Sequence, residues 1–371
     1  MTDHTPDPVA PSRVIYIAPE SRAGGVGHYA DVFVEALRGR VPDVVEIRHP
    51  GPGEDTVRAL IRRRRAIRGH LADRQDAVVH SEISGGSVES FWPTAFLERR
   101  HGPVHNSMTV HDPPGLVWWP LRTRLLSRSK WLNHGVHVPT VALARRSEKW
   151  VAGTRTLVAL SRMGARAAQE RYPRASVHHI PHFVVERAEI PAAVDRPRAV
   201  GLFGLVYRGK GFDQVAAIRA ALDPSIALRI AGRGTESLPA IDGVEILGGL
   251  DGTALDDFFA SIRALVVPYG NRSQLNYGPA YPASGAVAHS IAYLTPMVST
   301  AHGALAEMRD DGGAVVIDSG DENVASALAI AAGELVDDDD RLRRLSAELS
   351  ILRTRRSPAN VVAQFTDLWA R

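Results

Sequence analysis

The sequence predicts an α/β protein built from two doubly wound domains that face a central cleft. Short apolar runs alternate with helical segments, which is typical of parallel sheets covered by helices on both faces. This alternation stops at one polar, proline-containing segment and then begins again. The chain has 371 residues, of which 44% are hydrophobic, so it is long enough to bury two cores.

The apolar runs define the predicted strands. In the first half they are residues 14–17, 44–47, 77–80, 107–110 and 157–160, and in the second half 199–203, 227–230, 244–247, 264–267, 297–299 and 314–317. We therefore predict an N-terminal domain over residues 1–186, a linker over 187–198 and a C-terminal domain over 199–358. Residues 359–371 predict an amphipathic helix that packs back toward the N-terminal domain.

Composition narrows the classes of function. The chain has no cysteine, which excludes disulfides, thiolate metal sites and cysteine nucleophiles. It has no apolar run of about 18 residues and no signal peptide, so we expect a cytoplasmic protein without a transmembrane helix. Residues 1–186 hold 26 Lys and Arg against 18 Asp and Glu, a net charge of +8. This excess predicts a partner that carries phosphate or another anion, whereas no nucleic-acid-binding motif is present.

A glycine-rich turn follows the first predicted strand. Gly24, Gly25 and Gly27 stand between that strand and a helical segment, an order that places backbone N–H groups around an anion. Gly25, Gly27 and Ala30 also fit the dinucleotide-binding fingerprint. A purely structural turn is the alternative, because glycine tolerates a positive φ and a close backbone approach.

A second glycine-rich loop follows the first strand of the C-terminal half. Gly204 begins this loop, and Arg208 and Lys210 follow it. Lys210 is the only lysine of the second half of the chain. A cation at the carboxyl end of a strand is well placed to bind a diphosphate, although an ordinary surface lysine remains the alternative. The next strand ends in a further glycine-rich turn that contains Gly234.

The order of these landmarks resembles that of the family 4 retaining glycosyltransferases, which have GT-B architecture with two Rossmann-like domains. The matching stretches are Gly24–Gly27, His111-Asp112 in MTVHDPPG, IPHFV, Gly204 to Gly211, Ala231–Gly234 and LTPMVSTAHGALAEM. The resemblance implies a hexosyltransferase-type enzyme of polysaccharide or glycoconjugate biosynthesis. Its donor would be a UDP- or GDP-sugar, and its acceptor a hydroxyl of a glycan, a lipid-linked glycan or a secondary metabolite. The resemblance implies no cofactor, since the nucleotide sugar is a substrate.

The same resemblance implies roles for individual residues. His111 lies beside the transferred sugar, and Asp112 either orients His111 or contacts the acceptor. Lys210 and Arg208 stabilise the charge that grows on the leaving diphosphate. The helix that begins at Ser284 and Gly285 offers its free N–H groups to phosphate.

No divalent metal is expected, because the chain lacks an Asp-x-Asp pair at a strand end. The acidic run Asp337–Asp340 lies between helices. His178, His179 and His182 are close in sequence, but no carboxylate stands near them, and we assign them to structure rather than to a metal.

The chain departs from the family pattern at the donor site. The family usually has an arginine immediately after the glycine of the second loop, and this chain has Leu205 there. The family also usually has two glutamates separated by seven residues. Tyr281 and His289 occupy the glutamate positions. We therefore expect the sugar to be read by other groups of the preceding loop, in particular Asn271 and Arg272.

The acceptor side is predicted from the first half. His28 follows the first glycine-rich turn, and His80 and Glu82 end a strand. Trp118 and Trp119 open the segment LVWWPLRTRLLSRSKWLNH, which mixes tryptophans with cations. Three interpretations of this segment remain open: peripheral contact with the inner face of a membrane, a frame for an anionic acceptor, and an ordinary helix with tryptophans packed inward.

Three other functions remain open. The missing carboxylates favour a non-catalytic relative that binds a nucleotide sugar or a glycan. A nucleotide-sugar epimerase has the same two-domain fold. The interpretation as a nicotinamide dehydrogenase is supported only by the fingerprint at Gly25, Gly27 and Ala30.

Overall fold

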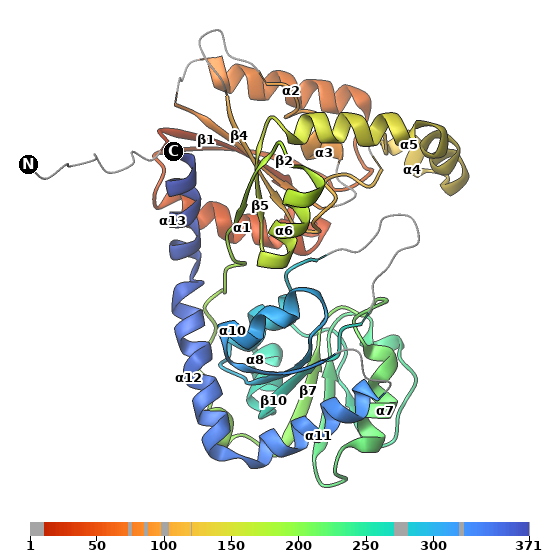
Figure 1. Ribbon diagram of the computed structural model, residues 1–371, viewed down its shortest axis with the longest axis vertical. Helices are drawn as coiled ribbons and strands as arrows, with labels where there is room; N and C mark the ends of the chain where they lie inside the picture. The colour runs from red at the N-terminus through yellow and green to blue at the C-terminus, as the bar shows by residue number, and fades with distance from the viewer. Residues whose placement is uncertain are drawn as a thin grey trace, which may run out of the picture. The chain divides into compact units, whose positions relative to one another are not determined.

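The computed structural model describes residues 11–72, 76–84, 88–97, 104–119, 121–270, 281–318 and 323–370. The chain divides into two compact units (Figure 1). Unit 1 contains the chain up to Pro181, the short segment at residues 281 and 282, and the C-terminal segment from Pro358. Unit 2 contains the remainder, which begins at His182 and ends at Ser357.

Unit 1 is built on a six-stranded parallel sheet with the strand order β2-β1-β3-β4-β5-β6. Its strands are β1 (Arg13–Pro19), β2 (Asp43–His49), β3 (Val78–Ile83), β4 (His105–Val110), β5 (Thr156–Ala159) and β6 (Ser176–His179). The first five correspond to the predicted apolar runs, and β6 carries His178 and His179. Parallel strands buried on both faces explain why these runs are almost continuously apolar.

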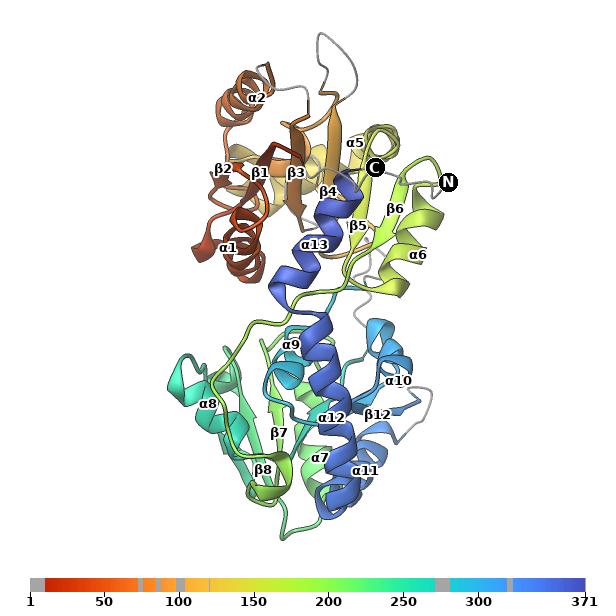
Figure 2. The same cartoon turned by 90° about the vertical axis from the view of Figure 1, so that its left-hand side faces the viewer.

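Helices cover both faces of this sheet. They are α1 (Gly25–Arg38), α2 (Val57–Ala72), α3 (Val88–Phe91), α4 (Arg124–Ser127), α5 (Lys130–Ala152), α6 (Arg162–Arg171) and α13 (Pro358–Trp369). On one face, Ile67 of α2 packs on Ile15 and Ile17 of β1. On the other face, α1 and α13 lie next to each other (Figure 2). Phe33 of α1 meets Phe365 of α13 edge to face, with ring centroids 4.9 Å apart. The C-terminal helix is therefore part of the core of unit 1.

Unit 2 repeats the architecture with the strand order β12-β11-β10-β7-β8-β9. Its strands are β7 (Ala199–Phe203), β8 (Ala227–Ala231), β9 (Val244–Ile246), β10 (Ala264–Val267), β11 (Met297–Thr300) and β12 (Ala314–Ile317). Its helices are α7 (Val215–Ala221), α8 (Thr253–Ala260), α9 (Gly285–Ala292), α10 (Met308–Asp311), α11 (Val324–Asp337) and α12 (Asp339–Arg355). Alternate residues of β10 face opposite cores: Val266 packs with α7 and α11, and Leu265 packs with α8 and α9. The prediction of two parallel sheets covered by helices is confirmed.

The segment predicted as a linker, residues 187–198, clusters with unit 2. Arg196 explains this, because its guanidinium is buried and is surrounded by acceptors. It donates to the carbonyl oxygens of Pro191, Phe259 and Tyr293 at 2.7, 3.2 and 2.9 Å. A charged group buried in this way must be fully hydrogen-bonded, so the segment is held in one conformation.

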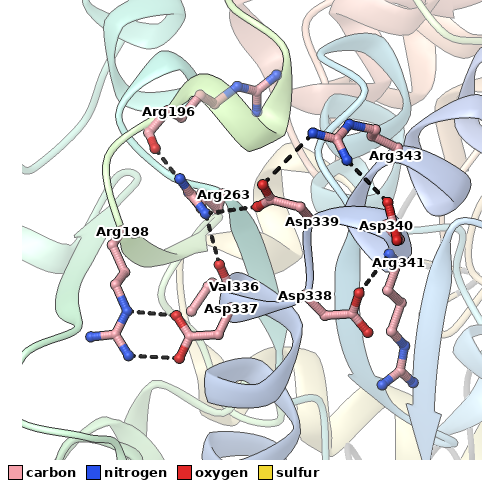
Figure 3. A network of polar contacts seen from close by, with 10 residues as sticks. All are labelled: Arg196, Arg198, Arg263, Val336, Asp337, Asp338, Asp339, Asp340, Arg341 and Arg343. Atoms are coloured by element: carbon pink, nitrogen blue, oxygen red, sulfur yellow. Dashed lines mark hydrogen bonds and ion pairs between the residues drawn. The ribbon is translucent and has the colours of Figure 1, made fainter.

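The acidic run Asp337–Asp340 joins α11 to α12, and arginines hold most of it (Figure 3). Arg198 binds both carboxylate oxygens of Asp337 at 2.6 Å. Arg263 and Arg343 both pair with Asp339. Asp338 accepts the backbone N–H of Arg341 at 2.9 Å and thereby caps α12. These carboxylates therefore have a structural role at the helix junction.

Two glycines are required by close backbone approaches. A Cβ on Gly27 would lie 2.2 Å from the carbonyl oxygen of Glu20, so the first glycine-rich turn can pack only around a glycine. Gly211 has a φ of +78°, and its Cβ would lie 2.1 Å from the carbonyl oxygen of Pro268. This contact fixes the loop that carries Lys210 against the end of β10.

Candidate functional site

A row of polar side chains crosses the buried sheet of unit 1. The register pairs Tyr16 of β1 with His80 of β3, His80 with Ser107 of β4, and Glu82 with Thr109. Since side chains alternate along a strand, these residues share the face that α1 and α13 cover. Their periodicity of two within apolar strands is visible in VVHSEI and HNSMTV. That signal is present in the sequence, but Tyr16, Ser107 and Thr109 were not among the predicted site residues.

Glu82 is the centre of this row. It is fully buried, and its Oε1 accepts hydrogen bonds from the Tyr16 hydroxyl at 2.8 Å and from His80 Nε2 at 3.2 Å. Its Oε2 accepts a hydrogen bond from His111 Nε2 at 2.7 Å. Burial by itself raises the pKa of Glu82, but the hydrogen bonds from His111 and His80 outweigh it and lower the pKa to about 2. The side chain is therefore a buried carboxylate at neutral pH.

His111 follows β4 and has a side chain that is 11% exposed. Its Nε2 donates to Glu82, and the edge of its ring meets Tyr29 at a centroid distance of 4.9 Å. Nδ1 has no hydrogen-bond partner among the described residues, so the ring presents an acceptor lone pair. Asp112 was predicted as one candidate to orient His111. The carboxylate that binds the ring is instead Glu82 of the neighbouring strand, and Asp112 accepts a hydrogen bond from Ser84 at 2.9 Å.

The predicted acceptor-side residues separate into two groups. His80 and Glu82 were expected to line the acceptor site, and this prediction is wrong for the structure as it stands, because both are completely buried. His28 is exposed in the first turn of α1. Trp118 is half-buried, and Trp119 packs against His134 and His137 of α5 with centroid distances of 5.0 and 4.4 Å.

Unit 2 carries a different polar chain at the carboxyl ends of its strands. Lys210 Nζ donates to the hydroxyl of Tyr269 at 2.5 Å and lies 3.8 Å from the centroid of that ring. The Tyr269 hydroxyl is 2.8 Å from Ser284 Oγ. Ser284 caps α9 by accepting the N–H of Val287. A cation is thus linked through the Tyr269 hydroxyl to the start of a helix, an arrangement that favours the binding of an anion. Tyr269 was not among the predicted site residues.

The other predicted groups of the glycine-rich loops follow strands of their own units. Gly204 and Gly234 both have positive φ values, +144° and +95°, at the turns after β7 and β8. Arg208 is exposed, and so is Leu205 at 58%. In unit 1, Gly24 has a φ of +114° and precedes α1, which begins at Gly25.

The positions of the two missing glutamates differ from expectation. His289 Nε2 accepts from Arg187 at 3.4 Å, so its proton lies on Nδ1, which donates to the carbonyl oxygen of Gly285 at 2.8 Å. Burial, together with the charge of Arg187, lowers the pKa of His289. Both ring nitrogens are therefore used inside unit 2, and neither is available to a ribose. Tyr281 belongs to unit 1, where its N–H donates to the carbonyl oxygen of Pro113 at 2.8 Å. Asn271 and Arg272 lie outside the described residues.

A second buried carboxyl group in unit 1 contrasts with Glu82. Glu89 lies in the first turn of α3, and its Oε1 accepts the N–H of Gly53 at 2.7 Å. Its Oε2 is buried without a partner among the described residues. Burial raises the pKa of Glu89 to about 7. The nearby His49 is also buried, which lowers its pKa to about 3 and keeps the ring neutral.

The described ranges contain no group of three or more His, Asp or Glu that could hold a metal ion. His178 contacts Ser176, and His182 Nδ1 contacts the carbonyl oxygen of Phe183. Among the described helices, none is long and apolar enough to cross a membrane.

The fold can be assigned from these observations. Two parallel sheets of six strands, each covered by helices, match the GT-B fold with its two Rossmann-like domains, which solved glycosyltransferase structures have. The fold that the motif order implied is confirmed.

Particular solved structures match the chain over almost its whole length. The Anabaena protein HepE, in a structure described as a complex with UDP-glucose, has a TM-score of 0.62 and 11% identity, covering 96% of this chain and 98% of that one. A glycosyltransferase from Rickettsia africae has a TM-score of 0.63 and 10% identity, covering 97% and 98%. A UDP-forming trehalose-phosphate synthase from Burkholderia vietnamiensis has a TM-score of 0.61 and 11% identity, covering 96% and 99%. No family model and no curated protein matches the sequence.

Proposed function

We propose that this protein is a retaining glycosyltransferase that moves a sugar from a nucleoside diphosphate sugar to a hydroxyl acceptor without a divalent metal. The observation that carries the proposal is the chain Lys210–Tyr269–Ser284 at the start of α9. It places a cation and a helix N-terminus at the carboxyl ends of the strands of a GT-B domain, where doubly wound sheets bind their ligands.

The proposed reaction needs little covalent chemistry from the protein. The bond between the anomeric carbon and the diphosphate oxygen breaks, and a new bond to the acceptor oxygen forms on the same face of the sugar. The acceptor proton passes to the departing diphosphate. Negative charge therefore grows on the diphosphate, and Lys210, Arg208 and the N-terminus of α9 stabilise it. They take the place of a metal ion.

Unit 1 supports the proposal through His111 and the turn at Gly24–Gly27. His111 is held by a buried carboxylate and presents Nδ1 as an acceptor, which suits a hydroxyl of the sugar. The α1 helix begins beside Gly24 without a side-chain cap, so its N–H groups suit a phosphate. We assign the transferred sugar to His111 and the acceptor to the surrounding residues of unit 1.

We infer a uridine diphosphate donor of the hexose type, since solved structures of similar fold are described as complexes with UDP-glucose and UDP. The two family glutamates are replaced by Tyr281 and His289. We therefore assign sugar selectivity to the polar residues of the loop that precedes α9, including Asn271, Arg272 and Gln274.

Incubation with a panel of nucleotide sugars tests this proposal. We expect nucleoside diphosphate release with at least one UDP-sugar, unchanged activity after exhaustive chelation, and a product whose anomeric configuration equals that of the donor. Inversion of configuration would remove the retaining mechanism, and restoration of activity by magnesium or manganese would remove the metal-free account. If nucleoside diphosphate binds but no donor is transferred or hydrolysed, the protein is a binding relative.

The segment from Leu121 to Leu143 suggests where the acceptor resides. It lies within a stretch between Asp112 and Glu148 that contains six Arg and Lys and no acidic residue. Leu125, Trp131, Val138 and Leu143 are exposed, Trp131 at 89%, so the interpretation with inward-packed tryptophans is wrong for Trp131. Exposed apolar side chains among cations suit an anionic lipid surface. We therefore propose peripheral contact with such a membrane.

Sedimentation with lipid vesicles tests the membrane contact. We expect binding to vesicles that contain phosphatidylglycerol, and its loss in the double variant Leu125→Ala/Trp131→Ala. Ile330→Ala is the matched control, because Ile330 is an exposed apolar residue of unit 2. Equal binding of the double variant and the wild type would exclude this surface.

A further inference from the structure

The polar row of unit 1 extends beyond Glu82 to the last helix of the chain. Trp369 of α13 donates from Nε1 to Ser107 Oγ at 2.9 Å, and both groups are buried. Ser107 Oγ is 2.7 Å from His80 Nδ1, and His80 Nε2 is 3.2 Å from Glu82 Oε1. Glu82 Oε2 then binds His111. Every link in this chain of contacts lies inside unit 1.

The donors and acceptors of these groups favour one direction for the hydrogen bonds. An indole N–H can only donate, so Ser107 Oγ accepts from Trp369. The Ser107 proton then has His80 Nδ1 as its acceptor. In this arrangement His80 carries its proton on Nε2, where Thr109 Oγ1 at 3.0 Å and Glu82 Oε1 at 3.2 Å can accept it. The aromatic surroundings, with Phe365 at 5.3 Å and Trp369 at 5.2 Å between centroids, exclude water from this ring.

The orientation of the carboxylate follows from this assignment. Oε1 of Glu82 is occupied by Tyr16 and His80, which leaves Oε2 to face His111. If the indole donor is removed, the Ser107 hydroxyl is no longer held by Trp369 and can rotate to accept from Nδ1 of His80, while the Thr109 hydroxyl at 3.0 Å can donate to Nε2. His80 would then turn a lone pair toward Oε1, and the carboxylate would be repelled from its present position. His111 would lose its fixed orientation as a consequence.

We propose that Trp369 is a positioning residue for His111, acting through Ser107, His80 and Glu82. The last helix of the chain thereby sets the tautomer of a buried histidine and the direction of a candidate catalytic ring. The consequence for catalysis rests on the proposed glycosyl transfer, but the assignment of the proton does not.

The tautomer of His80 tests the proposal without any activity. In protein labelled with ¹⁵N-histidine, long-range ¹H–¹⁵N correlations should show that His80 is protonated on Nε2 and unprotonated on Nδ1. The His80 signal is identified as the one that disappears in His80→Asn. Trp369→Phe, which keeps an aromatic ring, should shift His80 toward the other tautomer. Protonation on Nδ1 in the wild type, or an identical His80 signal in Trp369→Phe, would overturn the proposal.

Kinetics test the consequence for His111. We expect Trp369→Phe and Ser107→Ala each to lower kcat about tenfold, while the donor KM stays within about twofold of the wild type. The double variant should have a kcat no lower than that of Ser107→Ala alone, because both residues act through the same row of hydrogen bonds. Phe365→Leu is the control for packing, since it contacts the same ring without a hydrogen bond, and it should lower stability while keeping the wild-type tautomer. Additive losses in kcat would contradict the relay. If the wild type transfers no sugar, the proposed function fails and the tautomer measurement still decides the relay.

Discussion

The two units carry hydrogen-bonded chains of opposite charge. In unit 1 the donors of Tyr16, His80 and His111 converge on the buried carboxylate of Glu82. In unit 2 the chain begins at the ammonium group of Lys210, passes through Tyr269 and ends at Ser284, where a helix starts. The buried anion of unit 1 holds a side chain in place, whereas the cation of unit 2 is linked to the start of a helix, an arrangement that favours an anion. This difference is the basis for our proposal that unit 2 binds the nucleotide and that unit 1 aligns a histidine.

The largest effect is expected at Glu82. Glu82→Gln keeps the shape of the side chain but removes the charge that Tyr16, His80 and His111 satisfy. A pKa of about 2, against an ordinary value of 4.5, corresponds to about 3 kcal/mol of folding stability. This stability is present above pH 4.5 and is lost as the pH falls toward 2. Chemical denaturation between pH 2 and 8 should show an acid-dependent loss in the wild type that is much smaller in Glu82→Gln.

The second prediction concerns Glu89, a buried carboxyl group with a single hydrogen-bond donor. Because its pKa is raised to about 7, its contribution to stability belongs to the protonated form. That contribution is present below pH 4.5 and is lost as the pH rises through 7. Glu89→Gln mimics the protonated form, so we expect it to be more stable than the wild type by about 1–2 kcal/mol at pH 8. The two proteins should converge at pH 4, and a destabilised variant at pH 8 would contradict this reading.

The smallest effect is expected at Tyr269. Tyr269→Phe keeps the ring beside Lys210 Nζ but removes the hydroxyl that links Lys210 to Ser284. The ammonium of Lys210 loses its bond to this hydroxyl but remains available to the diphosphate, so we expect only an indirect effect of about 0.5–1.5 kcal/mol, which lowers nucleoside diphosphate affinity about two- to tenfold. Isothermal titration measures it, with Tyr207→Phe as the control for the other tyrosine near Lys210. An equal loss in both variants would show that the link to Ser284 has no special role.

Much of the fold could be predicted from the sequence because alternating apolar runs report local structure. Residues at strand ends, such as Lys210 and His111, were also identified, since parallel strands gather their carboxyl ends at one edge. The partner of His111 was not, because neighbouring residues at a strand end point to opposite faces. Asp112 is adjacent in sequence, but Glu82 on the neighbouring strand shares the face of His111. Strand order and register decide that pairing, and a single sequence does not contain them.

The burial of His80 could not be predicted for a related reason. Its position near the end of β3 suggested access to a ligand, but the helix α13 covers that face with Phe365 and Trp369. The sequence predicts that this helix packs toward the N-terminal domain, but only the tertiary structure shows that it covers His80. The same long-range packing brings Trp369 into the polar row.

The division of labour between the units is the central claim, and calorimetric titration with uridine diphosphate tests it most directly. Lys210→Ala removes one charge-assisted contact of about 1.5–3 kcal/mol, so we expect its Kd to rise about ten- to a hundredfold. His111→Ala should bind the nucleotide within about twofold of the wild type, while its turnover of sugar falls strongly. An unchanged Kd in Lys210→Ala, or a loss of affinity in His111→Ala as large as that in Lys210→Ala, would contradict the account.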